Sequence, residues 1–177
     1  MLIRWSAAVA AAILLSSPAL LQGASAADKP SDPQIAHIAY TAGNIDIAAG
    51  KQALAKSHNK AVRSFASEMV RDHTAVNDKA LALVKKLHVT PEDNATSQSL
   101  SKGAAAELQT LAKLKGHAFD KAYVNNEVAY HKTVNGALKD TLIPSAKNGE
   151  LKSLLQTGLT LFQEHQKHAE QLAAKLK

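Results

Sequence analysis

The chain contains no cysteine and few aromatic residues, and both features exclude certain classes of protein. Without cysteine there is no disulfide, thiolate metal ligand, iron–sulfur cluster, c-type haem attachment or lipid-modified N-terminal cysteine. Stability therefore has to come from burial of a core, which a chain of 177 residues can supply. Hydrophobic residues make up 46% of the chain and aromatic residues only 4%. This composition, rich in alanine and leucine, is typical of a helical bundle.

The chain also lacks a block of basic residues, although its formal net charge is +6. Lysines alternate with acidic residues along the expected helices, which is typical of a solvated surface. Nucleic-acid sites need a basic cluster and often stacking aromatic side chains, so we do not expect nucleic-acid binding. The charge falls to +5 if the first 26 residues, which include Arg4, are removed. That charge is compatible with weak attraction to anionic surfaces of the cell envelope.

The longest apolar run lies at the N-terminus, and it indicates an export signal. Arg4 supplies a positive charge, Ala7–Leu15 an apolar stretch, and Ala24-Ser25-Ala26 an A-x-A cleavage site. We expect residues 1–26 to be a signal peptide and 27–177 to be one domain. The apolar stretch is shorter than the about 20 residues that span a membrane, and no later segment comes close. The sequence thus predicts an exported, periplasmic protein without a transmembrane segment; an uncleaved signal anchor is the alternative.

Four segments carry apolar residues at alternating spacings of three and four, the pattern of one buried helix face. They cover about 32–57, 60–87, 119–142 and 148–176. The first begins at Asp32-Pro33, an N-cap followed by a proline that suits the first helical turn. Pro144 is expected to end the third.

Between the second and third segments lies a long connection, His88 to about Ser101, rich in polar residues. It leads into a short helix over about 102–115 that Gly116 is expected to close. A long crossover within a four-helix pattern is typical of ferritin-like bundles. The sequence therefore predicts an all-α, ferritin-like four-helix bundle whose long crossover carries a short extra helix.

Each apolar stripe carries one ionisable side chain in a position that suits an apolar residue. These are Asp46, His73, His131 and His165, and Glu127 is a further member of the third stripe. Counting from each helical hairpin with a rise of about 1.5 Å per residue, Asp46 lies roughly level with His73, and His131 with His165. The crossover leaves the relative depth of the two pairs open.

Ionisable side chains are costly to bury, so these residues should contact each other, water or a metal ion. One interpretation is a hydrogen-bonded polar layer across the bundle. The other is a metal site, because carboxylate and imidazole ligands without thiolate suit iron, manganese, zinc or copper. Its ligands would be Asp46, His73, Glu127, His131 and His165.

Other candidates carry weaker signals. His37, His58, His88 and His117 lie near helix ends or connections and are expected to be exposed, whereas Tyr123 and Tyr130 are expected to be core residues. Glu68 and Asp72 lie one step off the second stripe, where they could flank the buried face or face water. We find no sequence-local catalytic motif, so a catalytic role is not predicted, although a triad dispersed in sequence stays open.

Several motifs together resemble a known family. They are Asp46; Phe65-Ala66-x-x-Met69-Val70-x-Asp72-His73; Phe119-Asp120-x-x-Tyr123 with His131; and His165-x-x-x-Ala169-x-x-Leu172. From Pro33 to Leu176 the chain is similar to an exported bacterial family of unknown function with a ferritin-like fold, whose members are often catalogued as predicted outer-membrane proteins. The resemblance implies a four-helix bundle and, for a helical chain, at most a peripheral association with the outer membrane.

The resemblance implies no reaction. The wider ferritin-like superfamily uses a Glu-x-x-His motif on each of two helices, whereas Glu127 and His131 are spaced by four. Our first hypothesis is therefore a non-enzymatic binding or stress-related module of the cell envelope. The alternative is a metal-binding or metal-dependent redox protein with an Asp/His site inside the bundle.

Overall fold

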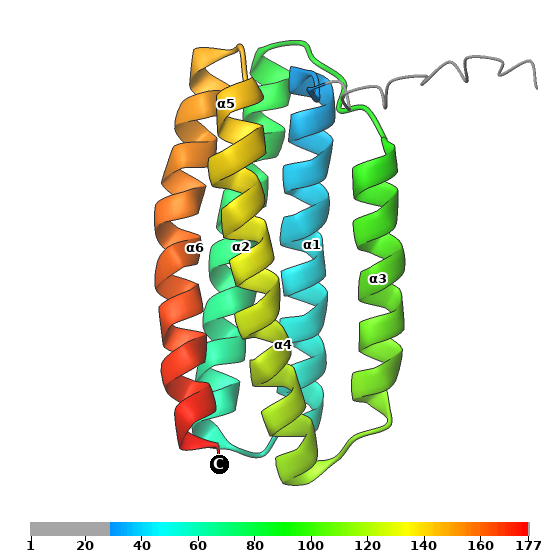
Figure 1. Cartoon of the computed structure of the whole chain (residues 1–177), viewed down its shortest axis with the longest axis vertical. Coiled ribbons are helices and arrows are strands. Elements are labelled where there is room, and N and C mark those ends of the chain that lie inside the picture. Colours follow the sequence, from blue (N-terminus) through cyan, green and yellow to red (C-terminus); the bar gives the residue numbers. More distant parts are fainter. Residues whose placement is uncertain (1–28, 177) are drawn as a thin grey trace, which may run out of the picture.

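The computed structural model describes residues 29–176, so the predicted signal peptide lies outside the described residues. The chain forms an all-α bundle of long helices with a fifth helix against one side (Figure 1). The elements are α1 (Asp32–Lys56), α2 (Lys60–Lys86), α3 (Ala95–Ala112), α4 (Gly116–Ala137), a π-helical turn (Leu138–Leu142), α5 (Ile143–Ser145) and α6 (Gly149–Lys175). The predicted fold class is confirmed.

The crossover gives the bundle its ferritin-like topology. Helix α1 packs against α2 and α4, and α6 packs against α4 and α2, so the four long helices form a closed ring. Helix α3 lies outside this ring beside α1 and returns the chain to the end at which α2 began (Figure 1). Consequently α2 and α4 run in the same direction on opposite corners, while neighbours within the four-helix ring are antiparallel and α3 runs parallel to α1.

Side-chain caps explain where the helices begin. Ser31 and Gln34 form a reciprocal capping box at the start of α1, and Asn59 and Asn148 accept bonds from the free backbone N–H groups of α2 and α6. The Asp32 carboxylate accepts bonds from the backbone N–H of Lys147 and Asn148, both 2.8 Å long. This contact fixes the start of α1 against the start of α6.

Three predicted boundaries were wrong. The crossover helix starts at Ala95, seven residues before the predicted start, because Asn94 and Ser97 form a capping box there. Gly116 does not close that helix; with φ of +53° it opens α4, and Lys113 is the cap. Pro144 does not end the third long helix either, since the chain widens into the π-helical turn and continues helically to Ser145.

Helices α1 and α2 approach closely at glycines of α1. A Cβ atom on Gly50 would lie 2.9 Å from Val70 Cγ2 and 3.0 Å from the backbone oxygen of Ala66. Only glycine allows this separation, so the packing compensates for the low helix propensity of this residue.

The core consists of two apolar clusters at opposite ends of the bundle. One is centred on Phe65, Met69 and Tyr123, and the other includes Ile35, Leu155 and Phe162. The ionisable residues of the four stripes fall between the two clusters. They therefore form a layer across the middle of the bundle, enclosed by apolar side chains on both sides.

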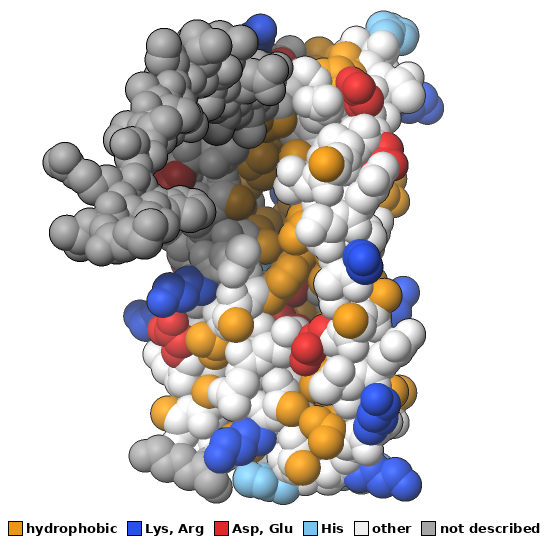
Figure 2. All heavy atoms as spheres, turned by 45° about the vertical axis from the view of Figure 1, so that its right-hand side comes forward, with side chains coloured by type: hydrophobic (Ala, Val, Ile, Leu, Met, Phe, Trp, Pro, Cys, Tyr) orange, Lys and Arg blue, Asp and Glu red, His pale blue; other side chains and the backbone are white. Residues whose placement is uncertain are grey.

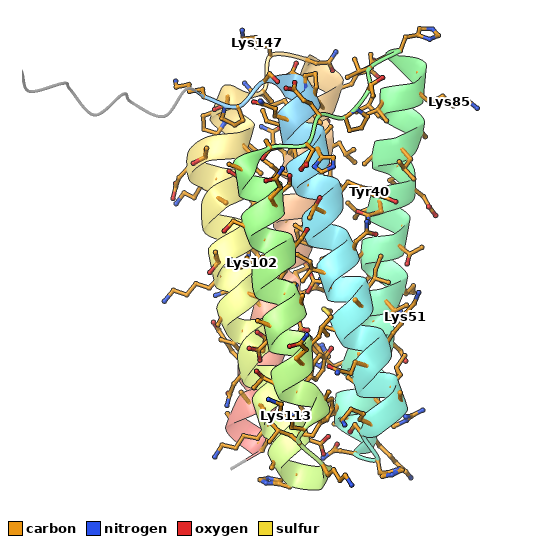
Figure 3. All side chains as sticks on the ribbon, turned by 90° about the vertical axis from the view of Figure 1, so that its right-hand side faces the viewer. Tyr40, Lys51, Lys85, Lys102, Lys113 and Lys147 are labelled. Atoms are coloured by element: carbon orange, nitrogen blue, oxygen red, sulfur yellow. The ribbon has the colours of Figure 1, made fainter. Side chains whose placement is uncertain are left out.

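The outer surface matches the alternating charge pattern of the sequence. Lysines project from different parts of the bundle, among them Lys51, Lys85, Lys102, Lys113 and Lys147 (Figure 3). None of the helices between residues 29 and 176 is long and apolar enough to cross a membrane.

Candidate metal centre

The structure brings all five predicted site residues together inside the bundle. Asp46 comes from α1, His73 from α2, Glu127 and His131 from α4, and His165 from α6. Each is only 1% exposed to solvent. The two residues of each hairpin lie level with each other as predicted, and the crossover places the two pairs at the same depth.

The three imidazole rings face one another. Their ring centroids are 5.6 Å apart for His73 and His131, 5.3 Å for His73 and His165, and 5.6 Å for His131 and His165. One nitrogen of each ring lies within 4.8 Å of a nitrogen of both others. Three converging nitrogen donors from three different helices are an arrangement suited to a transition-metal ion.

The two carboxylates lie beside these rings. Asp46 Oδ2 is 3.5 Å from His73 Nε2, and Glu127 Oε2 is 3.5 Å from His131 Nδ1. One oxygen of each carboxylate and one nitrogen of His131 lie within 4.8 Å of one another. Burial, and next the nearby Glu127 carboxylate, hold the pKa of Asp46 well above its usual range. Ionisation of the Asp46 carboxyl is therefore costly in this buried region.

Hydrogen bonds within the protein leave most of these polar atoms unused. Among the described residues, eight buried atoms of the five side chains have no hydrogen-bond partner: both oxygens of Asp46 and of Glu127, both nitrogens of His73, Nε2 of His131 and Nδ1 of His165. A buried polar atom without a partner costs about 1–3 kcal/mol, and native structures have few of them. The five side chains do not satisfy one another as a closed hydrogen-bonded layer would.

The backbone of α4 determines which nitrogen of His131 is free. Nδ1 lies 3.0 Å from the backbone oxygen of Glu127. A carbonyl oxygen can only accept, so Nδ1 carries the proton and donates it. Nε2 is left with its lone pair facing the buried layer, as a metal-binding histidine requires.

An acidic residue beyond the layer orients His165. The Nε2 proton of His165 is donated to Asp72 Oδ2 at 3.1 Å, which leaves the lone pair on Nδ1. Asp72 also accepts two bonds from the Arg71 guanidinium, at 2.6 and 2.9 Å. The bonds from Arg71 and His165 hold the pKa of Asp72 below its usual range, although its partial burial acts the other way. An ionised carboxylate behind a ligating imidazole is a recurring feature of metal sites.

Burial keeps at least two of the imidazoles neutral at physiological pH. Desolvation, followed by the neighbouring rings His131 and His165, lowers the pKa of His73 well below its usual value. Desolvation also lowers the pKa of His165, more than the bond to Asp72 raises it. Neutral imidazole is the form that binds metal ions.

Apolar surroundings complete the site. The Phe162 ring stacks on His73 with centroids 4.5 Å apart and an interplanar angle of 13°. Phe162 also lines a cavity of about 660 Å³ whose walls are mostly apolar. Hydrophobic side chains gather in a hollow on one face of the molecule (Figure 2). Such surroundings lower the local dielectric and raise the cost of leaving the carboxylates without a counter-ion.

The structure adds residues that sequence periodicity does not assign to the site. Glu68 and Asp72 cannot be assigned to the site from periodicity alone. A residue one position away from the apolar stripe can lie either at the edge of the core or in open solvent. Tyr123 is buried as predicted, and its hydroxyl has no partner among the described residues. Burial and the Glu127 carboxylate raise its pKa well above the usual value.

The histidines expected to be exposed lie away from the layer. His58, His88 and His117 are exposed as predicted. His37 is the exception, since it is half-buried and its Nδ1 lies 3.8 Å from an oxygen of Asp93.

The chain matches the model of one domain family of unknown function, and its fold is similar to that of a solved structure. The family model described as "Domain of unknown function (DUF4142)" matches residues 17–172. Among solved structures, a DUF305 protein of Streptomyces coelicolor, described as secreted, is similar with a TM-score of 0.69. The two share 11% identity over 81% of this chain and 91% of the other, so the similarity shows the fold alone. No curated protein matches the chain.

Proposed function

The chain belongs to the DUF4142 family, a domain family of unknown function, and we propose that it is an exported protein that binds one first-row transition-metal ion inside its helical bundle. His73, His131 and His165 would supply nitrogen ligands, and Asp46 and Glu127 would supply oxygen. The single observation that carries this proposal is the group of eight buried polar atoms without hydrogen-bond partners among the described residues. A metal ion would use the lone pairs that the protein itself leaves free.

Charge balance supports the same proposal. Asp46 and Glu127 carry two negative charges when ionised, and the neighbouring imidazoles are neutral ligands. A divalent cation would neutralise this pair without leaving a net charge in the core. Nitrogen-rich ligand sets favour zinc, iron, copper or nickel over magnesium and calcium, which prefer oxygen alone.

The hydrogen-bonded polar layer is the competing interpretation. It would require most lone pairs and protons to be satisfied within the layer, whereas eight of these atoms have no hydrogen-bond partner among the described residues. The centre is assigned a binding role in the cell envelope. No reaction is assigned to it.

Metal content tests the proposal. The protein is purified from the periplasm of its native host without chelator or affinity tag, and its metals are measured by inductively coupled plasma mass spectrometry. We expect about one transition-metal ion per chain, falling at least tenfold in His73→Ala and in His165→Ala. His58→Ala, which removes an exposed imidazole, is the matched control and should keep its metal.

Circular dichroism of each variant checks that the bundle still folds, so that metal loss can be attributed to the ligand. Substoichiometric metal that is the same in all four proteins would contradict the proposal. The five residues would then be a structural polar layer.

A further inference from the structure

A second group of potential ligands lies between the buried centre and the surface. Glu68, Asp72 and His165 each offer one ligand atom, and these atoms lie within 4.8 Å of one another. Glu68 and Asp72 are four residues apart on α2, so they lie on one face of that helix. This face meets α6, where His165 contacts Asp72 and His168 contacts Glu68. The group thus joins two neighbouring helices.

Exposure decreases step by step along this group. The side chain of His168 is 44% exposed, that of Glu68 30%, that of Asp72 16% and that of His165 1%. These four side chains, joined in pairs by hydrogen bonds, therefore extend from the surface toward the interior. The buried centre itself has almost no exposed surface, so an ion needs such a path to reach it.

His165 belongs to both groups of ligands. Its Nε2 contacts Asp72 at 3.1 Å, while its buried Nδ1 has no partner among the described residues. The two nitrogens lie on different edges of one ring. The same imidazole can therefore hold Asp72 through Nε2–H and still offer the free lone pair of Nδ1 to an ion.

We propose that Glu68, Asp72 and His165 form an entry site that captures a divalent transition-metal ion between α2 and α6 and delivers it to the buried centre. This inference rests on the proposed function, because an entry site has a role only if the buried centre binds metal. Capture at the entry site sets the rate at which metal enters, whereas the five buried ligands, together with the bond from His165 to Asp72, determine how tightly metal is held.

Glu68 is the outermost carboxylate of the entry site. Its Oε2 lies 2.8 Å from Nδ1 of the half-exposed His168, and an ion would displace this imidazole from the carboxylate. Asp72 is held more firmly, since Arg71 and His165 both donate to it. A carboxylate has about four lone-pair positions, so Asp72 can keep these bonds and still contact an ion.

The proton of His165 can stay on Nε2 throughout. Nε2 would keep its bond to Asp72, the Glu68 and Asp72 carboxylates would hold the entering ion, and the free Nδ1 lone pair of His165 would receive it. The ring would stay neutral at each stage.

Stopped-flow measurement of cobalt(II) binding tests the entry site. The purified protein is stripped of metal with a chelator, which is then removed, and mixed with cobalt(II); its d–d absorption reports both the rate of binding and the dissociation constant. Carboxylate-lined entrances raise association rates by about tenfold or more. We therefore expect Glu68→Gln to load about tenfold more slowly, with a dissociation constant within about twofold of the unaltered protein.

Two further variants act as controls. Glu164→Gln makes the same change of charge at an exposed position next to His165 in sequence, and it should load at the unaltered rate. His168→Gln frees Glu68 from its partner, so loading should be no slower than in the unaltered protein. Slower loading in His168→Gln would mean that the imidazole captures the ion, which would overturn the proposal.

The remaining outcomes separate the two proposals. If the unaltered protein binds no cobalt, both the buried centre and its entry site are wrong. If cobalt binds tightly but Glu68→Gln loads at the unaltered rate, the entry site alone is wrong. If Glu68→Gln loads normally and releases cobalt faster, Glu68 is a ligand of the bound ion, and the entry role is again refuted.

Discussion

Replacement of Asp46 by asparagine should separate the stability of the bundle from its ability to bind metal. Asp46 is 1% exposed, and neither of its carboxylate oxygens has a hydrogen-bond partner among the described residues. In the metal-free protein this carboxyl group is either ionised in a dry core or protonated against its ordinary pKa. Both states cost free energy, and asparagine removes the charge and its titration while it keeps nearly the same shape and a polar side chain.

The magnitude follows from the cost of such a group. Relieving one buried, unpartnered charge is worth about 1–3 kcal/mol. For a domain of about 150 residues, each kcal/mol shifts the melting temperature by about 2–4 °C. We therefore expect metal-free Asp46→Asn to melt about 2–12 °C above the metal-free unaltered protein. With metal present the order should reverse, because the variant lacks a ligand and gains less from binding.

Calorimetric melts at pH 7.5, with chelator and with excess zinc, provide the measurement. Asp78→Asn removes an exposed carboxylate of α2 and should change the free energy of unfolding by less than about 0.5 kcal/mol in either condition. If metal-free Asp46→Asn is instead less stable than the unaltered protein by more than about 1 kcal/mol, Asp46 makes favourable contacts within the layer. The reasoning from unpartnered atoms would then be refuted.

Three further predictions concern orientation, pH and packing. Asp72→Asn should weaken cobalt binding about 10–100-fold in isothermal titration, because it removes the ionised acceptor behind His165; unchanged affinity would show that this bond does not matter. The lowered pKa values of His73 and His165 mean that the unfolded chain binds more protons below pH 6.5, so the metal-free protein should lose stability as the pH falls below that value. In urea denaturation at pH 7.5 and 5.5, His73→Leu should lose less, and an equal loss would contradict this assignment. Gly50→Ala should cost about 1–3 kcal/mol because its Cβ would meet α2, whereas Gly136→Ala, with open space around it, should not destabilise the protein in the same assay.

Much of the fold follows from local pattern. Alternating spacings of three and four identify each long helix and its buried face, because side chains that far apart lie on one side of a helix. Composition and crossover length then favour a ferritin-like bundle. Local capping explains the errors, since Asn94 with Ser97 starts α3 early and the π-helical turn carries the chain past Pro144.

The same periodicity is sufficient to identify the five buried candidates. An ionisable residue in the middle of an apolar stripe has to be buried, and helical rise places two residues of one hairpin at nearly the same level. Sequence alone could not relate the two hairpins, because the direction and length of the crossover determine their relative depth. Only the packing of α2 against α6 and of α1 against α4 brings Asp46, His73, Glu127, His131 and His165 into one layer.

The roles of Glu68 and Asp72 likewise depended on tertiary structure. On an isolated helix, a position one step off the apolar stripe is compatible with either solvent or an interface. The contact with α6 decides between them, since it places Asp72 against His165 and Glu68 against His168. The sequence by itself thus determined which faces are buried and which ionisable residues lie on them. Only the tertiary structure decided which polar atoms contact each other and which are left without a partner. These contacts depend on the distances between helices, which the local order of residues does not encode.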